Sequence, residues 1–295
     1  MKKNILFLVL LLAACQPPRP QPQGGWTLTD GLGRTVRLPQ APQRIISFAP
    51  SLTEMVYALG VQDRLVGVTA WCTYPPQAKA KPVVGDYLSP NLERIVMLKP
   101  DLVVLVGTSA SPVLAKLQAL GIPAFVFRSE GIADIGDDLR LLGAVTGAER
   151  TADSLARALK AREGSLRAAV DSIPLSRRPR VFAEISSQPL MSANSRSYIA
   201  ELVRLAGGVN IADSLPQLYG VINAETVVRQ RPDIILVLHP QSSAAEVRRR
   251  LGWGGIPAVR QGRVYAGLDL DLLMRPGPRF TEAARTLNSI FYGKK

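Results

Sequence analysis

The sequence predicts an α/β protein of two similar lobes, each built on a parallel sheet flanked by helices, with one long helix joining the lobes and a cleft between them. Three observations predict this fold. Motifs of the first half recur in the same order in the second half, short buried runs alternate with segments of helical period, and a proline-free stretch of 25 residues separates the halves. A chain of 295 residues is long enough for two such lobes.

The N-terminus has the pattern of an export signal. Lys2 and Lys3 precede an apolar run from Ile5 to Ala14, which is too short to span a membrane and ends at Cys15. Small residues before a cysteine indicate a lipoprotein signal over residues 1–14, after which Cys15 carries lipid; the alternative is an ordinary signal peptide. Its removal lowers the formal net charge from +13 to +11. We therefore expect an exported protein anchored to the cell envelope, periplasmic or on the outer face of the cytoplasmic membrane.

A tether and a hairpin follow the signal. Residues 15–25 are rich in proline and glutamine and have almost nothing to bury, which predicts a flexible, extended tether. Residues 26–38 alternate in polarity around Asp30-Gly31-Leu32-Gly33, which predicts a small hairpin. This hairpin begins an N-terminal lobe expected over residues 26–148.

The internal repeat sets the order of elements in both lobes. Each half begins with a buried strand, continues with an Asn-x-Glu motif and a second buried strand, and then has a Gly-Ile-Pro-Ala motif, at offsets of 132 to 136 residues. Helix-period segments lie between the strands and end at Gly60 and Gly207, where a helix C-terminus favours glycine. The matching segments are Pro42–Ser47 with Pro179–Ala183, Asn91–Glu93 with Asn223–Glu225, Leu102–Val106 with Ile234–Leu238, and Gly121–Ala124 with Gly255–Ala258.

One long helix is predicted between the halves. Residues 149–173 contain no proline and repeat apolar residues at helical spacing, so a continuous helix there would be about 37 Å long. Gly164 is its weak point. The helix separates the N-terminal lobe from a C-terminal lobe expected over residues 174–295.

The composition excludes several kinds of chemistry. One His and two Cys cannot supply a zinc finger, a binuclear metal centre or an iron–sulfur cluster, so we expect no metal site and no resident cofactor. No phosphate-binding loop, nucleophile elbow or dinucleotide motif is present, so we expect a binding protein rather than an enzyme. The excess of arginine indicates a solvated surface, not a nucleic-acid groove. If Cys15 carries lipid, Cys72 has no disulfide partner and is expected to be a small buried residue.

Aromatic residues gather where the predicted strands end. Because the carboxyl ends of parallel strands are where open α/β folds hold ligands, rings from both lobes are expected to clasp a large flat ligand. The alternative for each residue is packing in the core. The candidates are Phe48, Trp71, Tyr74 and Tyr87 in the first half, and Tyr219 with Arg275 in the second.

Three segments resemble a known family. RIISFAPSLTEMVYALG, VGVTAWCTYPP and GDYLSPNLERIVMLKPDLVV, within residues 26–290, are similar to the periplasmic substrate-binding proteins of ABC importers that have one long connecting helix, and above all to members that carry vitamin B12. The resemblance implies two Rossmann-like lobes, a corrinoid ligand such as cobalamin, and delivery to an ABC permease with its ATPase subunits. Other members carry ferric siderophores or heme, which stay open as alternatives; an exported chelatase-like enzyme is a more distant one.

The resemblance also implies roles for single residues. The family's ligand-contacting aromatics fall on Trp71, Tyr87 and Tyr219, and its pocket arginine falls on Arg275. Two further aromatic positions of the B12-binding members are Leu272 and Leu273 here, which leaves the ligand open.

Permease docking in the family uses one glutamate on each lobe, and these positions are Glu93 and Glu225 here. The alternative is that Asn91 and Asn223 cap helices whose first turn favours an acidic residue. Glu54 is interpreted as part of a helix start.

The remaining expectations concern His239 and assembly. His239 follows a predicted strand and could serve as an axial ligand to cobalt or heme iron, although a lone histidine in a loop is more often a surface residue. We expect a monomer that contacts the membrane through its lipid anchor and binds no nucleic acid.

Overall fold

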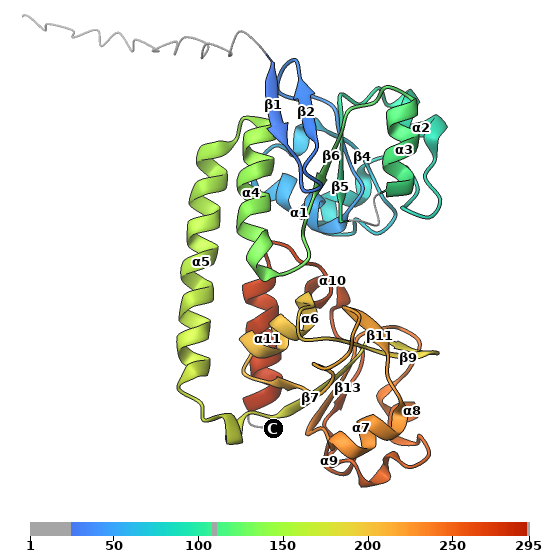
Figure 1. Cartoon of the computed structure of the whole chain (residues 1–295), viewed down its shortest axis with the longest axis vertical. Helices are drawn as coiled ribbons and strands as arrows, with labels where there is room; N and C mark the ends of the chain where they lie inside the picture. Colours follow the sequence, from blue (N-terminus) through green and yellow to red (C-terminus); the bar gives the residue numbers. More distant parts are fainter. Residues whose placement is uncertain (1–24, 108–110, 294–295) are drawn as a thin grey trace, which may run out of the picture.

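The computed structural model describes residues 25–107 and 111–293. The predicted signal (residues 1–14), Cys15 and all but the last residue of the tether lie outside the described residues. The fold is α/β, with two lobes stacked end to end and one long helix running beside both, as the sequence predicts (Figure 1). Among the described residues, no helix is long and apolar enough to cross a membrane.

The N-terminal lobe is built on a four-stranded parallel sheet in the order β4-β3-β5-β6. Strand β3 consists of Ile45, Ile46 and Ser47, all fully buried, and lies inside the sheet. The predicted hairpin forms as the antiparallel pair β1 and β2. The elements are β1 (Trp26–Thr29), β2 (Thr35–Leu38), β3 (Ile45–Ser47), α1 (Pro50–Ala58), β4 (Leu65–Val68), α2 (Leu92–Met97), β5 (Leu102–Val106), α3 (Ser111–Ala119), β6 (Ala124–Phe127) and α4 (Ile132–Thr146).

The C-terminal lobe repeats this plan with the order β10-β7-β12-β13, again parallel. A small antiparallel sheet of β11, β9 and β8 is added to it. The elements are β7 (Arg180–Glu184), β8 (Ser186–Ser187), β9 (Leu190–Ala193), α6 (Tyr198–Leu205), β10 (Val209–Asn210), β11 (Tyr219–Val221), α7 (Ala224–Gln230), β12 (Ile234–Val237), α8 (Ala244–Arg248), α9 (Pro257–Arg260), β13 (Val264–Tyr265), α10 (Leu270–Leu273) and α11 (Phe280–Tyr292).

The two sheets share one topology. In each lobe the chain starts in an inner strand, moves to the neighbour on one side, and then crosses back to the other side. The direction of winding therefore reverses between β3 and β5 in the first lobe and between β7 and β12 in the second. In open α/β sheets the crevice at the carboxyl ends of such a strand pair is the usual ligand position.

Helix α5 (Glu149–Asp171) joins the lobes and ends two residues before the predicted position. Arg178 closes this end, because its Nε donates to the carbonyl of Ile173 at 3.1 Å and its Nη2 to that of Val170 at 2.9 Å. One face of α5 is buried, at Ala152, Ala156, Leu159, Glu163 and Val170. Helix α4 of the first lobe and helices α6 and α11 of the second pack against α5.

The core has a shared part and two outer parts. One cluster contains buried residues of both lobes, including Leu139 of α4, Leu202 of α6 and Phe280 of α11, so apolar packing is continuous from lobe to lobe along α5. Separate clusters lie under α2 and α3 in the first lobe and under α7 and α9 in the second. Cys72 is free and buried, as expected.

Candidate functional site

Trp71 projects from the loop that follows β4. Its side chain is 65% exposed, which is unusual for so large an apolar ring. Tyr74, three residues later in the same loop, is 38% exposed. The first lobe therefore presents aromatic surface at the carboxyl ends of its strands, as the sequence predicts.

Tyr87 and Phe48 lie together beside this loop. The Tyr87 hydroxyl accepts a hydrogen bond from the backbone N–H of Val106 at 2.8 Å, and burial raises the pKa of Tyr87 to about 12. Phe48 packs edge-on against the Tyr87 ring, with centroids 5.8 Å apart. Phe48 is only 1% exposed, so the expectation that it contacts a ligand is corrected. It directly follows an inner strand of the sheet, and its buried ring packs behind Tyr87.

Tyr219 is the sequence-predicted aromatic residue of the second lobe, and its ring is partly exposed. It begins β11, where it pairs with Ala193 of β9, and it is 42% exposed. Desolvation and the nearby Glu201 carboxylate raise the pKa of Tyr219. Its ring is thus held on a strand rather than on a free loop.

Arg275 follows α10, and the first lobe holds its guanidinium. Its Nη2 donates to the Trp71 carbonyl and to the Thr73 hydroxyl, each at 2.8 Å, and it also pairs with Asp271. Nη1 lies 3.6 Å from a Glu54 oxygen and has no hydrogen-bond partner. The Arg275 side chain is 11% exposed, so little of it is left for a ligand.

Glu54 and Arg279 form a buried ion pair across the lobes that sequence reasoning missed. Arg279 donates to both oxygens of Glu54, at 2.8 and 2.9 Å, and its guanidinium lies 3.5 Å from the centroid of the Tyr74 ring. The interpretation of Glu54 as a helix-start residue was wrong, because its carboxylate faces the other lobe. No local pattern could have shown a pair that is 225 residues apart in the sequence.

These groups balance one another in charge. Arg275 and Arg279 are the two cations, and Glu54 and Asp271 are the two anions, so the cluster carries no net charge. The two guanidinium groups beside Trp71 and Tyr74 are therefore already matched by carboxylates.

His239 is not the surface residue that a lone loop histidine suggests. It is 7% exposed, its Nδ1 accepts from the backbone N–H of Gln241 at 3.1 Å, and its Nε2 lies 2.9 Å from a Glu184 oxygen. Arg250 binds the same carboxylate through two contacts of 2.6 Å. Both ring nitrogens are engaged, so neither is free to coordinate cobalt or iron in this structure.

A large cavity of the second lobe lies beside His239. It has a volume of about 750 Å³ and is formed by the residues that follow β12 and β13, at the carboxyl edge of the sheet. Its lining is mostly apolar, with Leu268 and Leu270 among the residues that face it, and Gln241, Ser242 and Ser243 add polar groups. The second lobe thus offers apolar surface with a few hydrogen-bonding groups at the carboxyl edge of its sheet.

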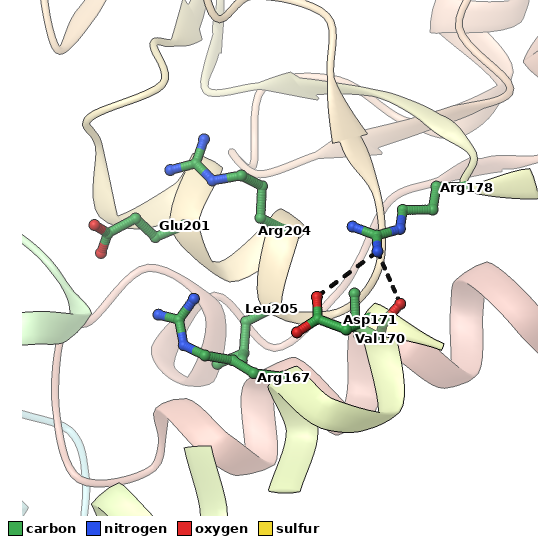
Figure 2. A pocket seen from close by; sticks show the side chains of 7 residues that line it. All are labelled: Arg167, Val170, Asp171, Arg178, Glu201, Arg204 and Leu205. Carbon is green, nitrogen blue, oxygen red and sulfur yellow. Dashed lines mark hydrogen bonds and ion pairs between the residues drawn. The ribbon is translucent and has the colours of Figure 1, made fainter. Parts of the chain in front are cut away.

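A smaller cavity of about 240 Å³ lies between α5 and α6, and three arginines surround it (Figure 2). Each of these guanidinium groups already has a hydrogen-bond or ion-pair partner, so we do not interpret the cavity as an anion-binding site. The partners are Glu163 for Arg167, Val170 and Asp171 for Arg178, and Ser195 and Asp213 for Arg204.

Glu93 and Glu225 stand in the first turns of α2 and α7, and both are exposed. The preceding residues Asn91 and Asn223 cap these helices, accepting from Arg94 N at 2.9 Å and from Glu225 N at 2.8 Å. Helices α2 and α7 lie on the side of the molecule away from α5, one in each lobe (Figure 1). The capping alternative is therefore correct for the asparagines, and the glutamate side chains remain free to meet a partner.

Metal ligands do not cluster in the part of the chain that the structure describes: no three His, Cys, Asp or Glu residues lie together in a suitable group.

Comparison with known proteins gives a family match and several relatives. Residues 45–269 match the family described as periplasmic binding protein. An uncharacterized ABC transporter substrate-binding lipoprotein of Bacillus subtilis, YvrC, is 29% identical over 98% of this chain and 95% of its own. A vitamin B12-binding protein of Yersinia pestis is 34% identical over 84% of this chain and 86% of its own.

Solved structures with the same fold bind different ligands. The vitamin B12-binding protein of Vibrio cholerae is 29% identical, with a TM-score of 0.73 over 85% of this chain and 97% of its own. The apo form of a heme-binding protein from Roseiflexus is 27% identical, with a TM-score of 0.76 over 85% of this chain and 98% of its own. Overall similarity alone does not choose between these two ligands.

Proposed function

Because the chain belongs to the periplasmic binding protein family, whose members are solute-binding proteins of ABC transporters, we propose that it captures a corrinoid, cobalamin, and delivers it to an ABC permease. The relatives named vitamin B12-binding proteins are 31 to 34% identical to it, and they support this ligand. We further propose that residues 1–14 are removed, that Cys15 carries the lipid anchor, and that residues 15–25 tether the lobes to the envelope.

The observation that carries the ligand assignment is exposed aromatic surface beside cations that are already paired with carboxylates. Trp71 and Tyr219 expose ring surface on opposite lobes, and the cluster of Arg275, Arg279, Glu54 and Asp271 has no net charge. Heme has two propionate groups and many ferric siderophores are anionic, so each favours unpaired cations in its site. A corrinoid has a broad ring edged by neutral amides, which matches aromatic and apolar surface together with the few polar groups around Gln241.

Heme is the second candidate, favoured by the fold similarity to heme-binding structures. The two ligands are separated by titrating the purified protein with cyanocobalamin, hemin and a ferric hydroxamate siderophore, following absorbance and heat. We expect saturable 1:1 binding of cyanocobalamin only. Binding of hemin without any binding of cyanocobalamin would falsify the corrinoid assignment.

Docking to the permease is proposed through Glu93 and Glu225. Both carboxylates are exposed, one on each lobe. An apolar groove of about 330 Å³ adjoins Glu225, and its rim includes Leu251, which is fully exposed. A carboxylate beside exposed apolar surface is typical of a protein interface. We expect basic residues on the permease to meet the two carboxylates.

A further inference from the structure

We propose that an inter-lobe bridge, formed by Glu54, Thr73, Asp271, Arg275 and Arg279, positions the Trp71 loop, so that the aromatic wall of the first lobe is held in place by the second lobe. Arg275 is then a positioning residue and does not bind charged groups of the ligand. The inference rests on the proposed function only in taking Trp71 as part of the ligand wall.

The bridge joins the lobes through direct contacts. From the second lobe, Arg279 grips Glu54 of α1 through two hydrogen bonds of 2.8 and 2.9 Å. Arg275 donates to the Trp71 carbonyl and the Thr73 hydroxyl at 2.8 Å each, and the Thr73 hydroxyl donates in turn to Asp271. The loop is thus held from the opposite lobe at the Trp71 carbonyl and at the Thr73 side chain two residues later.

Because the bridge is buried, its positive and negative side chains depend on one another for charge compensation. The side chains of Glu54, Arg275 and Arg279 are 4%, 11% and 16% exposed, so water screens their charges only weakly. Removing the Glu54 charge leaves two guanidinium groups facing Asp271 alone. The expected response is that Arg275 and Arg279 shift toward solvent and release the Trp71 carbonyl.

The geometry also gives the bridge a role in release. A permease that draws the lobes apart lengthens the contacts of Arg279 with Glu54 and of Arg275 with Trp71 at the same time. Loss of these contacts frees the loop that carries the ring. Separation of the lobes and loss of the fixed position of Trp71 therefore occur together.

The test uses Glu54→Gln and Thr73→Val in a Trp26→Phe background, where Trp253 is 1% exposed and Trp71 is the accessible tryptophan. Glu163→Gln is the matched control, because Glu163 is also buried and ion-paired, with Arg167 at 2.7 Å, but within α5. Acrylamide quenching of Trp71 is measured without ligand, the dissociation constant for cyanocobalamin by titration, and folding by circular dichroism.

We expect both bridge variants to increase Trp71 quenching and to weaken cyanocobalamin binding by about tenfold or more. The Glu163→Gln control is expected to change neither. Unchanged quenching and an affinity within about twofold of the parent protein in folded Glu54→Gln and Thr73→Val would overturn the proposal. If Glu54→Gln does not fold, Thr73→Val and Arg275→Lys carry the same test. If the parent protein binds no cyanocobalamin, the corrinoid assignment fails, whereas the quenching measurement still decides on the bridge.

Discussion

Trp71 concentrates the proposed binding surface in one side chain. Large rings at the centre of a contact surface contribute most of the binding free energy, so Trp71→Ala should weaken cyanocobalamin binding by about 10- to 100-fold. Leu251→Ala is the control, because Leu251 is also an exposed apolar residue but lies outside the cleft. Isothermal titration measures both, and equal loss of affinity in the two variants would argue against a specific role for the ring.

His239 is a case in which burial decides between two interpretations. Because its Nδ1 accepts from Gln241 N, its Nε2 is the donor to Glu184, and the ring holds the loop after β12 in place. We predict that His239→Ala lowers the unfolding temperature but leaves the visible spectrum of bound aquocobalamin unchanged. A shift of the cobalt bands in the variant would show that the imidazole reaches the metal.

Asp138 should make the stability of the protein depend on pH. Burial raises the pKa of Asp138 from 3.8 to about 6, although hydrogen bonds from Ser129 oppose the shift. A carboxyl group with a raised folded-state pKa stabilises the fold when protonated, so this contribution is complete below pH 4 and is lost as the pH rises to about 6.

The matched variants are Asp138→Asn and, as a control, Asp137→Asn at an exposed neighbour. Relative to Asp138→Asn, the wild-type free energy of unfolding should fall by about 2 kcal/mol between pH 4 and pH 7. Relative to Asp137→Asn it should stay nearly constant. Urea unfolding at each pH measures both differences, and a flat profile for both pairs would contradict the prediction.

At the scale of elements, a Gly→Ala substitution is predicted to have opposite effects on stability in α5 and in its neighbour α4. Gly164 of α5 has no atom within 4 Å of an added Cβ, whereas a Cβ on Gly143 of α4 would lie 2.4 Å from the Cβ of Ala152. Gly164→Ala should therefore stabilise the protein by about 0.5–1 kcal/mol, and Gly143→Ala should destabilise it by forcing α4 away from α5. Chemical denaturation of the two variants checks the opposite signs.

The elements were predictable wherever the signal was local. The strand at Ile45–Ser47, helix α6 and most of α5 follow from runs and periods within a few residues of one another, and the repeat then orders them into two sheets. The candidate site was predictable only in part. Exposure of Trp71 fits its position after a strand end, but the place of Tyr219 at the start of β11, the burial of Phe48 and the pairing of Glu54 with Arg279 depend on tertiary packing.

For the whole molecule, the two exposed glutamates predict a separation of binding from delivery. The double variant Glu93→Lys/Glu225→Lys should bind cyanocobalamin with unchanged affinity and abolish import, because both changes lie outside the cleft and reverse the charge that meets the permease. Glu149→Lys, at the exposed start of α5, is the control. Uptake of labelled cyanocobalamin by cells measures the effect, and normal uptake by the double variant would refute the docking assignment.

The single passage of the chain between the lobes has a mechanical consequence. Opening about a hinge needs loop residues that absorb large changes in backbone angle, but here the passage is a 23-residue helix about 34 Å long, packed against both lobes. The lobes are therefore connected by a rigid helix and not by a flexible hinge, and thermal motion alone should separate them only slightly. The ligand should therefore dissociate slowly until the transporter forces the lobes apart. The transporter, and not the binding protein, then determines when the ligand is released.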